Sequence, residues 1–337
     1  MGEASAEQYA SASAVPEVIR VAFGSRSRAP SVTQVTRMTI GLCHEVYRVE
    51  LDDAPGRCIV RLNRDATSLQ SMCFYAPVFT SLGIRVPQIL DGAYETDDRR
   101  RVDGYAWQVQ EYLEGVDACL AVPHMRREQL EQLGSEIARM IDVLRRQPTD
   151  GRFGYVVSGR HVDGDGASSW LETLPVGETK RRNAVLHVLP DEAIEACEAA
   201  VRENEHWLRE VEAECYFDDM SSKNVLVSRE SGALVGVCDV DGVAYGDPLE
   251  AVGRIYASFA HLEPQGVWYC DAIADALRLT SEQRRRVLLY ALLNHAFWAT
   301  ENGWAFNETN QAREPCREQV RARDRGRLGG RASGRAR

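Results

Sequence analysis

Alternating apolar and polar side chains characterise the first third of the chain. Three segments are rich in β-branched residues or alternate along their length, namely 32–38, 46–51 and 58–62. Turn residues separate the last two, among them Pro55 and Gly56. Because a period of two is typical of strands and short turns join neighbouring strands, the pattern predicts an antiparallel meander.

The pattern then becomes that of a helix over 67–82, and Gly83 supplies its end. Two further strands are expected over 86–90 and 106–112. The first part of the chain is therefore predicted to be a small lobe with the order β-β-β-α-β-β.

Beyond Gly115 the chain is mainly helical in pattern. Apolar residues recur at helical spacing over 127–146, and a second amphipathic helix is expected over 191–211. A further helical region is expected from residue 248 to about residue 303. This part of the chain is predicted to be a larger, helical lobe.

Two short β stretches, 225–227 and 234–238, interrupt the helices. The expected fold class is α+β, with an N-terminal antiparallel sheet lobe that carries one helix (1–113). A larger, mainly helical C-terminal lobe (114–320) and a basic, disordered tail (321–337) are expected to follow.

Charge is distributed unevenly along the chain. Fifty acidic side chains against 40 basic ones give a formal charge of −10. Residues 321–337 contain seven Arg and one Asp, so this segment carries +6 and the other 320 residues carry −16. A general nucleic-acid-binding protein needs a basic surface, so the acidic body argues against nucleic acid as a partner.

Cysteine usage and hydropathy predict a cytoplasmic protein without a membrane partner. The nine Cys form no C-x-x-C pair, and no Cys/His cluster has the spacing of a zinc site. No apolar run approaches the roughly 18 residues that span a bilayer, and residues 1–14 lack the features of a signal peptide. Free thiols in a reducing compartment are therefore expected.

The segment with the clearest chemistry is 217–227, which reads Phe-Asp-Asp-Met-Ser-Ser-Lys-Asn-Val-Leu-Val. In it Asp219 precedes Asn224 by five residues on a loop that leads into a strand, and Asp239 ends the next strand. Phosphoryl transfer from a nucleotide needs a carboxylate at the acceptor hydroxyl, an amide and a second carboxylate on magnesium, and a cation on the phosphates. This arrangement supplies the first three groups.

Together with Gly246-Asp247-Pro248, these residues resemble the aminoglycoside phosphotransferase family, which has a protein-kinase-like fold. The family pattern is H-G-D-x-x-x-x-N, then a hydrophobic strand with I-D-W, then G-D-P. This chain has Phe217-Asp218-Asp219 in place of H-G-D. The resemblance covers about residues 30–300 and implies a bilobal kinase-like fold. Asp247, which stands directly before Pro248, is expected to be a structural cap that anchors the loop.

The resemblance also implies roles for single residues. It makes Asp219 the catalytic base, and it makes Asn224 and Asp239 the ligands of Mg²⁺. The adjacent Asp218 is an alternative base, but the five-residue spacing to Asn224 favours Asp219.

The same resemblance assigns the nucleotide site to the first lobe. Gly41 lies in a segment like the family's phosphate-covering hairpin, and Arg61 stands where the phosphate-pairing Lys or Arg belongs. The implied hinge residues, whose backbone groups would bind adenine, are Gln110, Glu111, Tyr112 and Leu113. The implied co-substrate is ATP, or GTP, together with Mg²⁺.

Two departures from the family pattern bear on activity. Phe217 replaces an orienting His, and the helix over 67–82 contains no acidic residue. Gln70 is the nearest polar substitute for that acid, and its side chain is neutral. Arg61 would therefore keep its charge without an ion-pair partner and bind the phosphates directly. These departures leave two alternatives, an active enzyme and a catalytically weak pseudokinase that binds a nucleotide or another ligand.

The implied reaction moves a γ-phosphoryl group to a hydroxyl of a small molecule, in a monomer or a homodimer. The acidic body would attract a cationic acceptor such as an aminoglycoside antibiotic, but family members also act on other alcohols, so the acceptor stays open. Candidate acceptor contacts are Glu250, Glu301 and Asn302. Six late aromatic residues are expected mainly to pack the core, with some lining the acceptor pocket: Trp268, Tyr269, Tyr290, Phe297, Trp298 and Trp304.

Overall fold

The structure is a computed structural model and describes residues 11–26, 29–38, 45–95, 99–220 and 223–301. These residues form two compact units. The first unit contains the described residues up to 114, together with 156–160 and 235–242. The second unit contains 115–155, 161–234 and the described residues from 243 onward.

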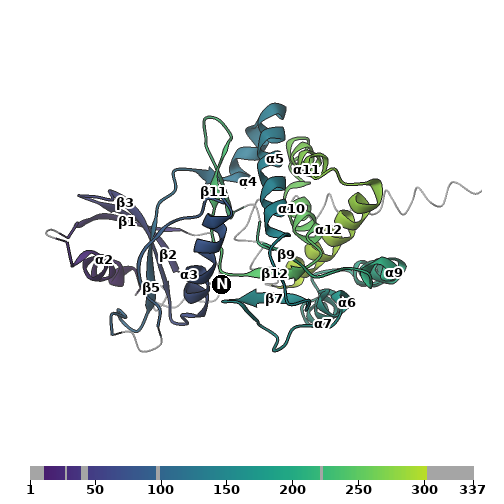
Figure 1. Ribbon diagram of the computed structural model, residues 1–337, viewed down its shortest axis with the longest axis horizontal. Coiled ribbons are helices and arrows are strands. Elements are labelled where there is room, and N and C mark those ends of the chain that lie inside the picture. The colour runs from purple at the N-terminus through teal and green to yellow at the C-terminus, as the bar shows by residue number, and fades with distance from the viewer. Residues whose placement is uncertain (1–10, 27–28, 39–44, 96–98, 221–222, 302–337) are drawn as a thin grey trace, which may run out of the picture. The chain divides into compact units, whose positions relative to one another are not determined.

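A five-stranded antiparallel sheet forms the centre of the first unit (Figure 1). Its strands are β1 (Val32–Met38), β2 (Glu45–Leu51), β3 (Arg57–Asn63), β4 (Ile89–Ala93) and β5 (Ala106–Glu111), in the spatial order β1-β2-β3-β5-β4. The helical segments of this unit are η1 (Ser11–Ala14), α2 (Val15–Phe23) and α3 (Thr67–Ser81). The predicted meander and the predicted helix over 67–82 are confirmed, but the expectation of one helix in this unit is wrong, because α2 is a second helix.

The strand expected over 86–90 is found three residues later, as β4. Pro87 has no N–H to donate, so the chain around it cannot form the interior of a strand. The carbonyl of Gln88 accepts a hydrogen bond from the N–H of Glu111 (2.8 Å). Strand pairing then begins with Ile89 opposite Gln110, and the register shifts before Asp91.

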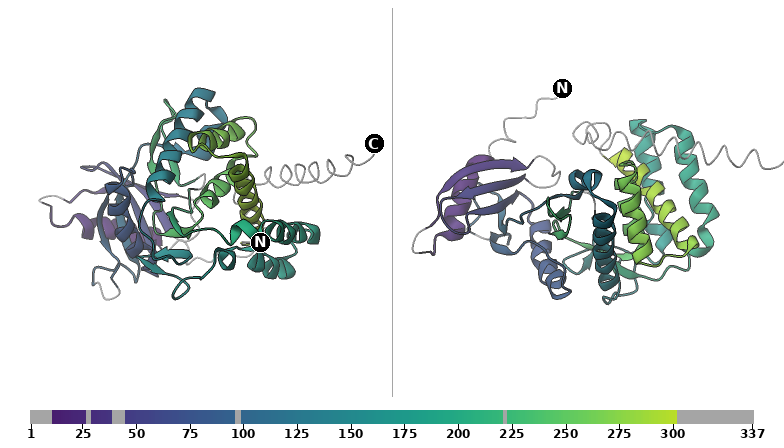
Figure 2. Two further views of the ribbon diagram at one scale, coloured as in Figure 1. Left: turned by 45° about the vertical axis from the view of Figure 1, so that its right-hand side comes forward. Right: turned by 90° about the horizontal axis from the view of Figure 1, so that it is seen from above.

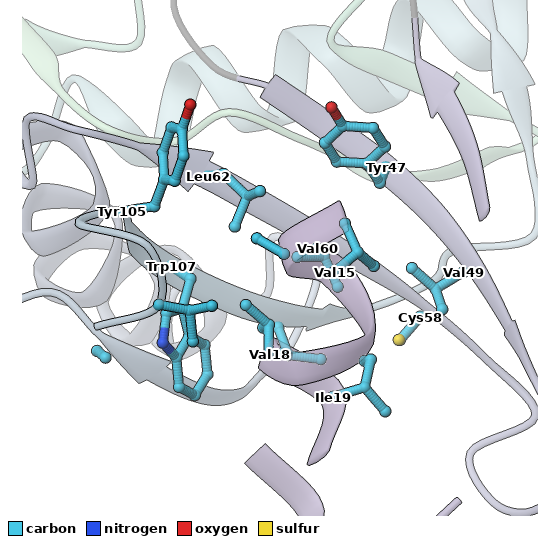
Figure 3. Close-up of a cluster of buried hydrophobic side chains, with 14 of the residues drawn as sticks. Val15, Val18, Ile19, Tyr47, Val49, Cys58, Val60, Leu62, Tyr105 and Trp107 are labelled. Carbon is cyan, nitrogen blue, oxygen red and sulfur yellow. The ribbon is translucent and has the colours of Figure 1, made fainter. Parts of the chain in front are cut away.

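Alternation along the strands places the two helices on opposite faces of this sheet. Trp107 and Val109 of β5 belong to the buried cluster that packs on α2 (Figure 3). Gln108, between them, points to the other face, where its Nε2 donates to the carbonyl of Leu69 in α3 (3.4 Å). The same alternation along β3 turns Arg61 toward α3.

The second unit is mainly helical, as predicted, and its last helices pack side by side (Figure 2). Its helical segments are α4 (Ala118–Ala121), η2 (Val122–His124), α5 (Arg127–Leu144), α6 (Trp170–Thr173), α7 (Val176–Leu186), α8 (Asp191–Glu203), α9 (Glu205–Leu208), α10 (Leu249–Phe259), α11 (Gln265–Ala276) and α12 (Ser281–Glu301). No helix within the described ranges is both long and apolar enough to cross a membrane.

Short strands interrupt the helices in the part of the chain after Gly115. They are β6 (Val116–Asp117), β7 (Gly154–Val157), β8 (Arg160–His161), β9 (Glu214–Tyr216), β10 (Val225–Val227), β11 (Leu234–Val237) and β12 (Val243–Gly246). Antiparallel pairing joins β6 to β10 and β9 to β12. The predicted β stretches correspond to β10 and β11, and the α+β class is confirmed.

The helix expected over 191–211 is divided at Asn204. Asn204 has a φ of −110°, and its Nδ2 donates to the carbonyl of Ala200 (2.7 Å). A short amide side chain competes in this way with the helical hydrogen bonds, so α8 ends earlier than the apolar pattern predicts.

Close packing of α10 against α12 brings polar residues of the two helices together. Gly253 of α10 faces Tyr290 of α12, and a Cβ added at Gly253 would lie 2.4 Å from the Cβ of Tyr290. No side chain fits at that distance, so the glycine permits the close approach of the two helices.

Candidate active site

The loop that carries Asp219 is held at both ends by short strands. β9 precedes the loop and pairs with β12, whereas β10 follows it and pairs with β6. Within the loop, Asn224 Nδ2 donates to Asp219 Oδ2 (2.6 Å) and to the carbonyl oxygen of Asp219 (3.0 Å). The five-residue spacing therefore brings the candidate base and a candidate metal ligand into direct contact.

The chemistry of its partners sets the orientation of the Asn224 amide. Asn224 is only 4% exposed. Both oxygen atoms of Asp219 in this contact are acceptors, so they must meet the NH₂ end of the amide. The Oδ1 atom of Asn224 is then turned away from Asp219, and an amide oxygen is a suitable ligand for a hard cation.

In the first unit, Arg61 forms an ion pair with Asp239. Arg61 Nη2 contacts Asp239 Oδ1, and 7% of the Arg61 side chain is exposed against 31% of the Asp239 side chain. Asp239 has a φ of +62°, which lies in the left-handed region that residues other than glycine seldom adopt. Strain of this kind persists where the surroundings enforce it and is frequent at functional sites, which supports more than a strand-ending role for Asp239.

Helix α3 presents a sulfur atom to Arg61 where a kinase helix would present a carboxylate. Arg61 Nη1 lies 3.3 Å from Met72 Sδ. Gln70, the expected polar substitute, is not the partner, because its Nε2 donates to the carbonyl of Tyr94 (2.8 Å). The expectation that Arg61 has no partner is wrong, since Asp239 pairs with it across the sequence.

The hinge candidates lie at the end of β5 and just after it. Gln110 is buried, and its Nε2 donates to Met72 Sδ (2.8 Å), so its side chain belongs to the α3 face of the sheet. Glu111 is the last residue of β5. Tyr112 and Leu113 follow in an irregular segment, in which backbone groups are not committed to a strand ladder. Such a segment can offer main-chain donors and acceptors to a ligand.

The second unit contains a cavity of about 640 Å³. Aromatic side chains line much of it: Phe153, Tyr155, Trp170, Tyr216, Tyr290 and Phe297. Its charged lining consists of five carboxylates and two guanidinium groups, from Asp163, Glu172, Glu178, Asp218, Glu250, Arg181 and Arg254. Because Asp218 immediately precedes Asp219, the cavity wall reaches the loop that carries the candidate base.

Asp218, Glu250 and Arg254 form a charged cluster in that wall. Arg254 Nε donates to Glu250 Oε1 (2.7 Å), and Arg254 Nη2 lies 3.5 Å from Asp218 Oδ2. Asn294 Nδ2 also donates to Glu250 Oε1 (2.9 Å). Burial would lower the pKa of Arg254, but Glu250 and Asp218 outweigh it and raise that pKa above its usual value. Arg254 is therefore positively charged.

Burial raises the pKa of the Asp218 carboxyl from 3.8 to about 6, although Arg254 acts in the opposite direction. The negative charges of Asp219 and Glu250 add to the increase. Asp218 is therefore mainly ionised at neutral pH and becomes protonated in mildly acidic solution.

A second chain of hydrogen bonds supports the same wall. Trp170 Nε1 donates to the hydroxyl oxygen of Tyr290 (2.8 Å), and that hydroxyl donates to Asp247 Oδ2 (2.9 Å). Asp247 Oδ1 accepts from the N–H of Leu249 at the start of α10 (3.0 Å). Asp247 thus ties the first turn of α10 to α6 and α12.

Several residues of this wall have no distinctive signal in the sequence. Asn294 occurs within an apolar stretch of α12, one turn after Tyr290, and therefore shares a helix face with Tyr290. From the sequence, Asp218 is only an alternative to Asp219 as the base. Of the candidate acceptor contacts, Glu250 lines the cavity. Gly41, Asn302 and the side chain of Glu301 lie outside the described residues.

Comparisons with known proteins place the chain in a family. Its similarity to solved structures extends over nearly the whole chain. Aminoglycoside phosphotransferase APH(4)-Ia is 18% identical, with 92% of this chain and 98% of that chain covered and a TM-score of 0.62. The GDP and kanamycin complex of APH(2")-IIIa is 12% identical, with coverage of 90% and 97% and a TM-score of 0.65.

A protein assigned as a fructosamine-3-kinase, from Haemophilus somnus 129PT, is also similar, at 12% identity, with coverage of 91% and 96% and a TM-score of 0.58. At these identities the similarity establishes the kinase-like fold. No curated protein matches the sequence. The profile of the phosphotransferase enzyme family, however, matches residues 35–288. The chain therefore belongs to the phosphotransferase enzyme family.

Proposed function

We propose that this protein transfers the γ-phosphoryl group of ATP or GTP to a hydroxyl group of a small molecule. The observation that carries the proposal is the contact between Asp219 and the buried amide of Asn224. In the proposed reaction Asp219 accepts or orients the proton of the acceptor hydroxyl, and Arg61 neutralises charge on the phosphates.

Asn224 and Asp239 are the residues that would hold Mg²⁺. Asn224 offers an amide oxygen, and Asp239 offers a carboxylate that is part-exposed. Mg²⁺ typically takes one or two carboxylates and completes its coordination with phosphates and water, so these two residues suit it. When bound, Mg²⁺ neutralises the charge of the phosphates.

The ion pair between Arg61 and Asp239 has a consequence for nucleotide binding. In the proposed function Arg61 has the phosphates as its partner, and Asp239 has the metal ion. The negative phosphates and the positive metal ion bind together. Nucleotide binding would therefore replace the ion pair between Arg61 and Asp239 by one contact from Arg61 to the phosphates and one from Asp239 to the metal ion.

The complexes of structurally similar proteins suggest the class of nucleotide and the class of acceptor. A thermostable mutant of APH(4)-Ia forms a ternary complex with AMP-PNP and hygromycin B, and APH(2")-IIIa forms a complex with GDP and kanamycin. We infer a purine nucleotide as the co-substrate of this chain, with adenine and guanine both as candidates. An aminoglycoside or another hydroxylated antibiotic is a candidate acceptor, and resistance on expression would then follow.

The test combines product detection with nucleotide binding. Asp219→Asn is expected to lower turnover by about 10²- to 10⁴-fold while nucleotide binding survives, because only proton handling is lost. Asp239→Asn is expected to weaken Mg²⁺-dependent nucleotide binding. Mass spectrometry of a panel of hydroxylated antibiotics and metabolites would detect the phosphorylated product. Thermal-shift titration with MgATP and MgGTP would measure binding.

The control is Asp191→Asn, which removes an exposed carboxylate in the first turn of α8 and is expected to change neither measurement. Full turnover by Asp219→Asn with a verified acceptor would show that Asp219 is not the base.

A nucleotide- or ligand-binding protein without turnover is the second candidate. Two observations favour it: Phe217 is buried where the family pattern has His, and Met72 faces Arg61 where a helix acid is usual. The same assays separate the two functions. A nucleotide-dependent thermal shift without a phosphorylated product from any acceptor would favour the binding protein.

A further inference from the structure

The turn between β7 and β8 has an unusual backbone conformation. Its two residues lie in the left-handed region, with a φ of +49° at Ser158 and of +75° at Gly159. Positive φ at both central residues is typical of a type I′ turn, which suits the twist of paired strands. Glycine adopts this conformation freely, but serine does not, so the surroundings must stabilise it at Ser158.

Two hydroxyl groups of α3 contact this turn. The N–H of Ser158 donates to Ser71 Oγ (2.8 Å). The hydroxyl of Tyr75 donates to the carbonyl of Val156 (3.0 Å) and accepts from the N–H of Gly159 (3.3 Å). Both side chains are buried, and residues four apart share a helix face. One face of α3 therefore holds the turn through three hydrogen bonds.

The hairpin that consists of β7, the turn and β8 (154–161) belongs to both units. Residues 156–160 belong to the first unit, as α3 does, whereas the residues on either side of them belong to the second unit. Those flanking residues include Gly154, Tyr155 and His161, which line the cavity. The chain therefore leads from the turn held by α3 to the cavity wall within a few residues.

Helix α3 also contacts the proposed nucleotide site. Met72, which follows Ser71 directly, places its Sδ atom 3.3 Å from Arg61 Nη1. The same turn of α3 thus contacts the proposed phosphate-binding residue through a thioether and the hairpin through a hydroxyl. Because a helix is a rigid element, it can fix both contacts at once.

We propose that Ser71 and Tyr75 are positioning residues for the acceptor. Their hydroxyl groups fix the hairpin and thereby hold Tyr155 and His161 in the cavity wall. Neither Ser71 nor Tyr75 is among the described residues that line the cavity, so they act on the acceptor through the hairpin. That the cavity receives the acceptor rests on the proposed function, whereas the attachment of the hairpin to α3 does not.

The first measurement is hydrogen exchange of peptides that cover 154–162, in the full chain without ligand. Tyr75→Phe and Ser71→Ala each remove a hydroxyl and are expected to speed exchange about 2- to 10-fold, the factor for one net hydrogen bond. The matched control is Ser81→Ala in the same helix, whose hydroxyl donates to the carbonyl of Val78 (2.7 Å) at an exposed position. This control should leave exchange of the hairpin unchanged.

The second measurement separates positioning from a loss of folded protein. With an acceptor verified by the product screen, Tyr75→Phe is expected to raise the KM of that acceptor about 2- to 10-fold, with kcat nearly unchanged. Thermal-shift titration with MgATP and MgGTP should show unchanged nucleotide affinity, because Arg61 and Asp239 are intact. A variant that is only less folded would instead lower kcat and leave KM unchanged.

Two outcomes would overturn the proposal. Unchanged exchange of 154–162 in both variants would show that α3 does not hold the hairpin, and faster exchange with an unchanged acceptor KM would show that the hairpin does not position the acceptor. Faster exchange without a phosphorylated product from any acceptor would reject the proposed function, and with it the acceptor role, but keep the attachment of the hairpin to α3.

Discussion

At the scale of single residues, Asp218 gives folding stability a pH dependence of unusual sign. Burial raises its pKa from 3.8 to about 6, so between these pH values the folded chain holds a proton that the unfolded chain releases. The contribution of Asp218 to stability is therefore present below about pH 4 and is lost as the pH rises toward 6. Asp218→Asn removes this loss, which amounts to about 1–3 kcal/mol in the free energy of unfolding.

The measurement is urea unfolding of wild type and Asp218→Asn at several pH values from 4 to 7. The variant should gain stability relative to the wild type across this window. Parallel pH profiles of the two proteins would contradict the raised pKa. Arg254 and the carboxylates of Asp219 and Glu250 are the charged neighbours whose effects this difference includes.

Contacts between site residues could be predicted where the two partners are close in the sequence, and not where they are far apart in it. The loop with Asp219 and Asn224 is recognisable because its chemistry depends on a local spacing. The partner of Arg61 was not predictable, because Asp239 lies 178 residues away and no periodicity connects the two. Helix α3 offered no acid, so the sequence suggested an unpaired cation, but the folded chain places a different carboxylate beside it.

At the scale of elements, the approach of α10 to α12 controls the cavity wall. Gly253→Ala would place a Cβ 2.4 Å from the Cβ of Tyr290, so the helices must separate. Overpacking of this kind costs about 1–3 kcal/mol, which exceeds the gain of about 1 kcal/mol in helix propensity. Chemical denaturation should show a net loss of stability. Separation would also pull Asn294 of α12 away from Glu250 of α10, so it would change the cavity wall.

Gly177→Ala in α7 is the matched control, because the nearest atom to its added Cβ is the flexible Arg181 Nη1 at 3.6 Å. This variant should be unchanged in stability or gain up to about 1 kcal/mol. A Gly253→Ala variant as stable as the control would show that α12 has room to move.

Long elements were predictable and short ones were not. Helix α5 and strands β1 to β3 have enough residues to express a period. β9 and β12 contain three and four residues, which are too few to show an alternating pattern. Their pairing nevertheless fixes the start of the loop that carries Asp219. The division of α8 from α9 depended on the hydrogen bond of one amide, at Asn204, which an apolar pattern does not contain.

At the scale of the whole molecule, residues 1–320 carry negative net charge and residues 321–337 carry positive net charge. The effect of the positive segment can be tested without changing the fold. The family match ends at residue 288, and the described structure ends at residue 301. Residues 321–337 carry seven Arg and one Asp, and their removal changes the formal charge from −10 to −16. Truncation after Val320 should therefore leave the melting temperature and the turnover number unchanged, since no candidate site residue is removed.

The same truncation should lower the KM of a cationic acceptor, because a more negative protein attracts the acceptor more strongly. The effect should appear at about 0.01 M salt, where the Debye length is about 30 Å, and should disappear near 0.15 M, where it is about 8 Å. Steady-state kinetics at the two salt concentrations, with a neutral acceptor as the control, would measure it. A salt-independent loss of turnover would instead show that the basic tail contributes to the site, and its charge would then belong to the mechanism.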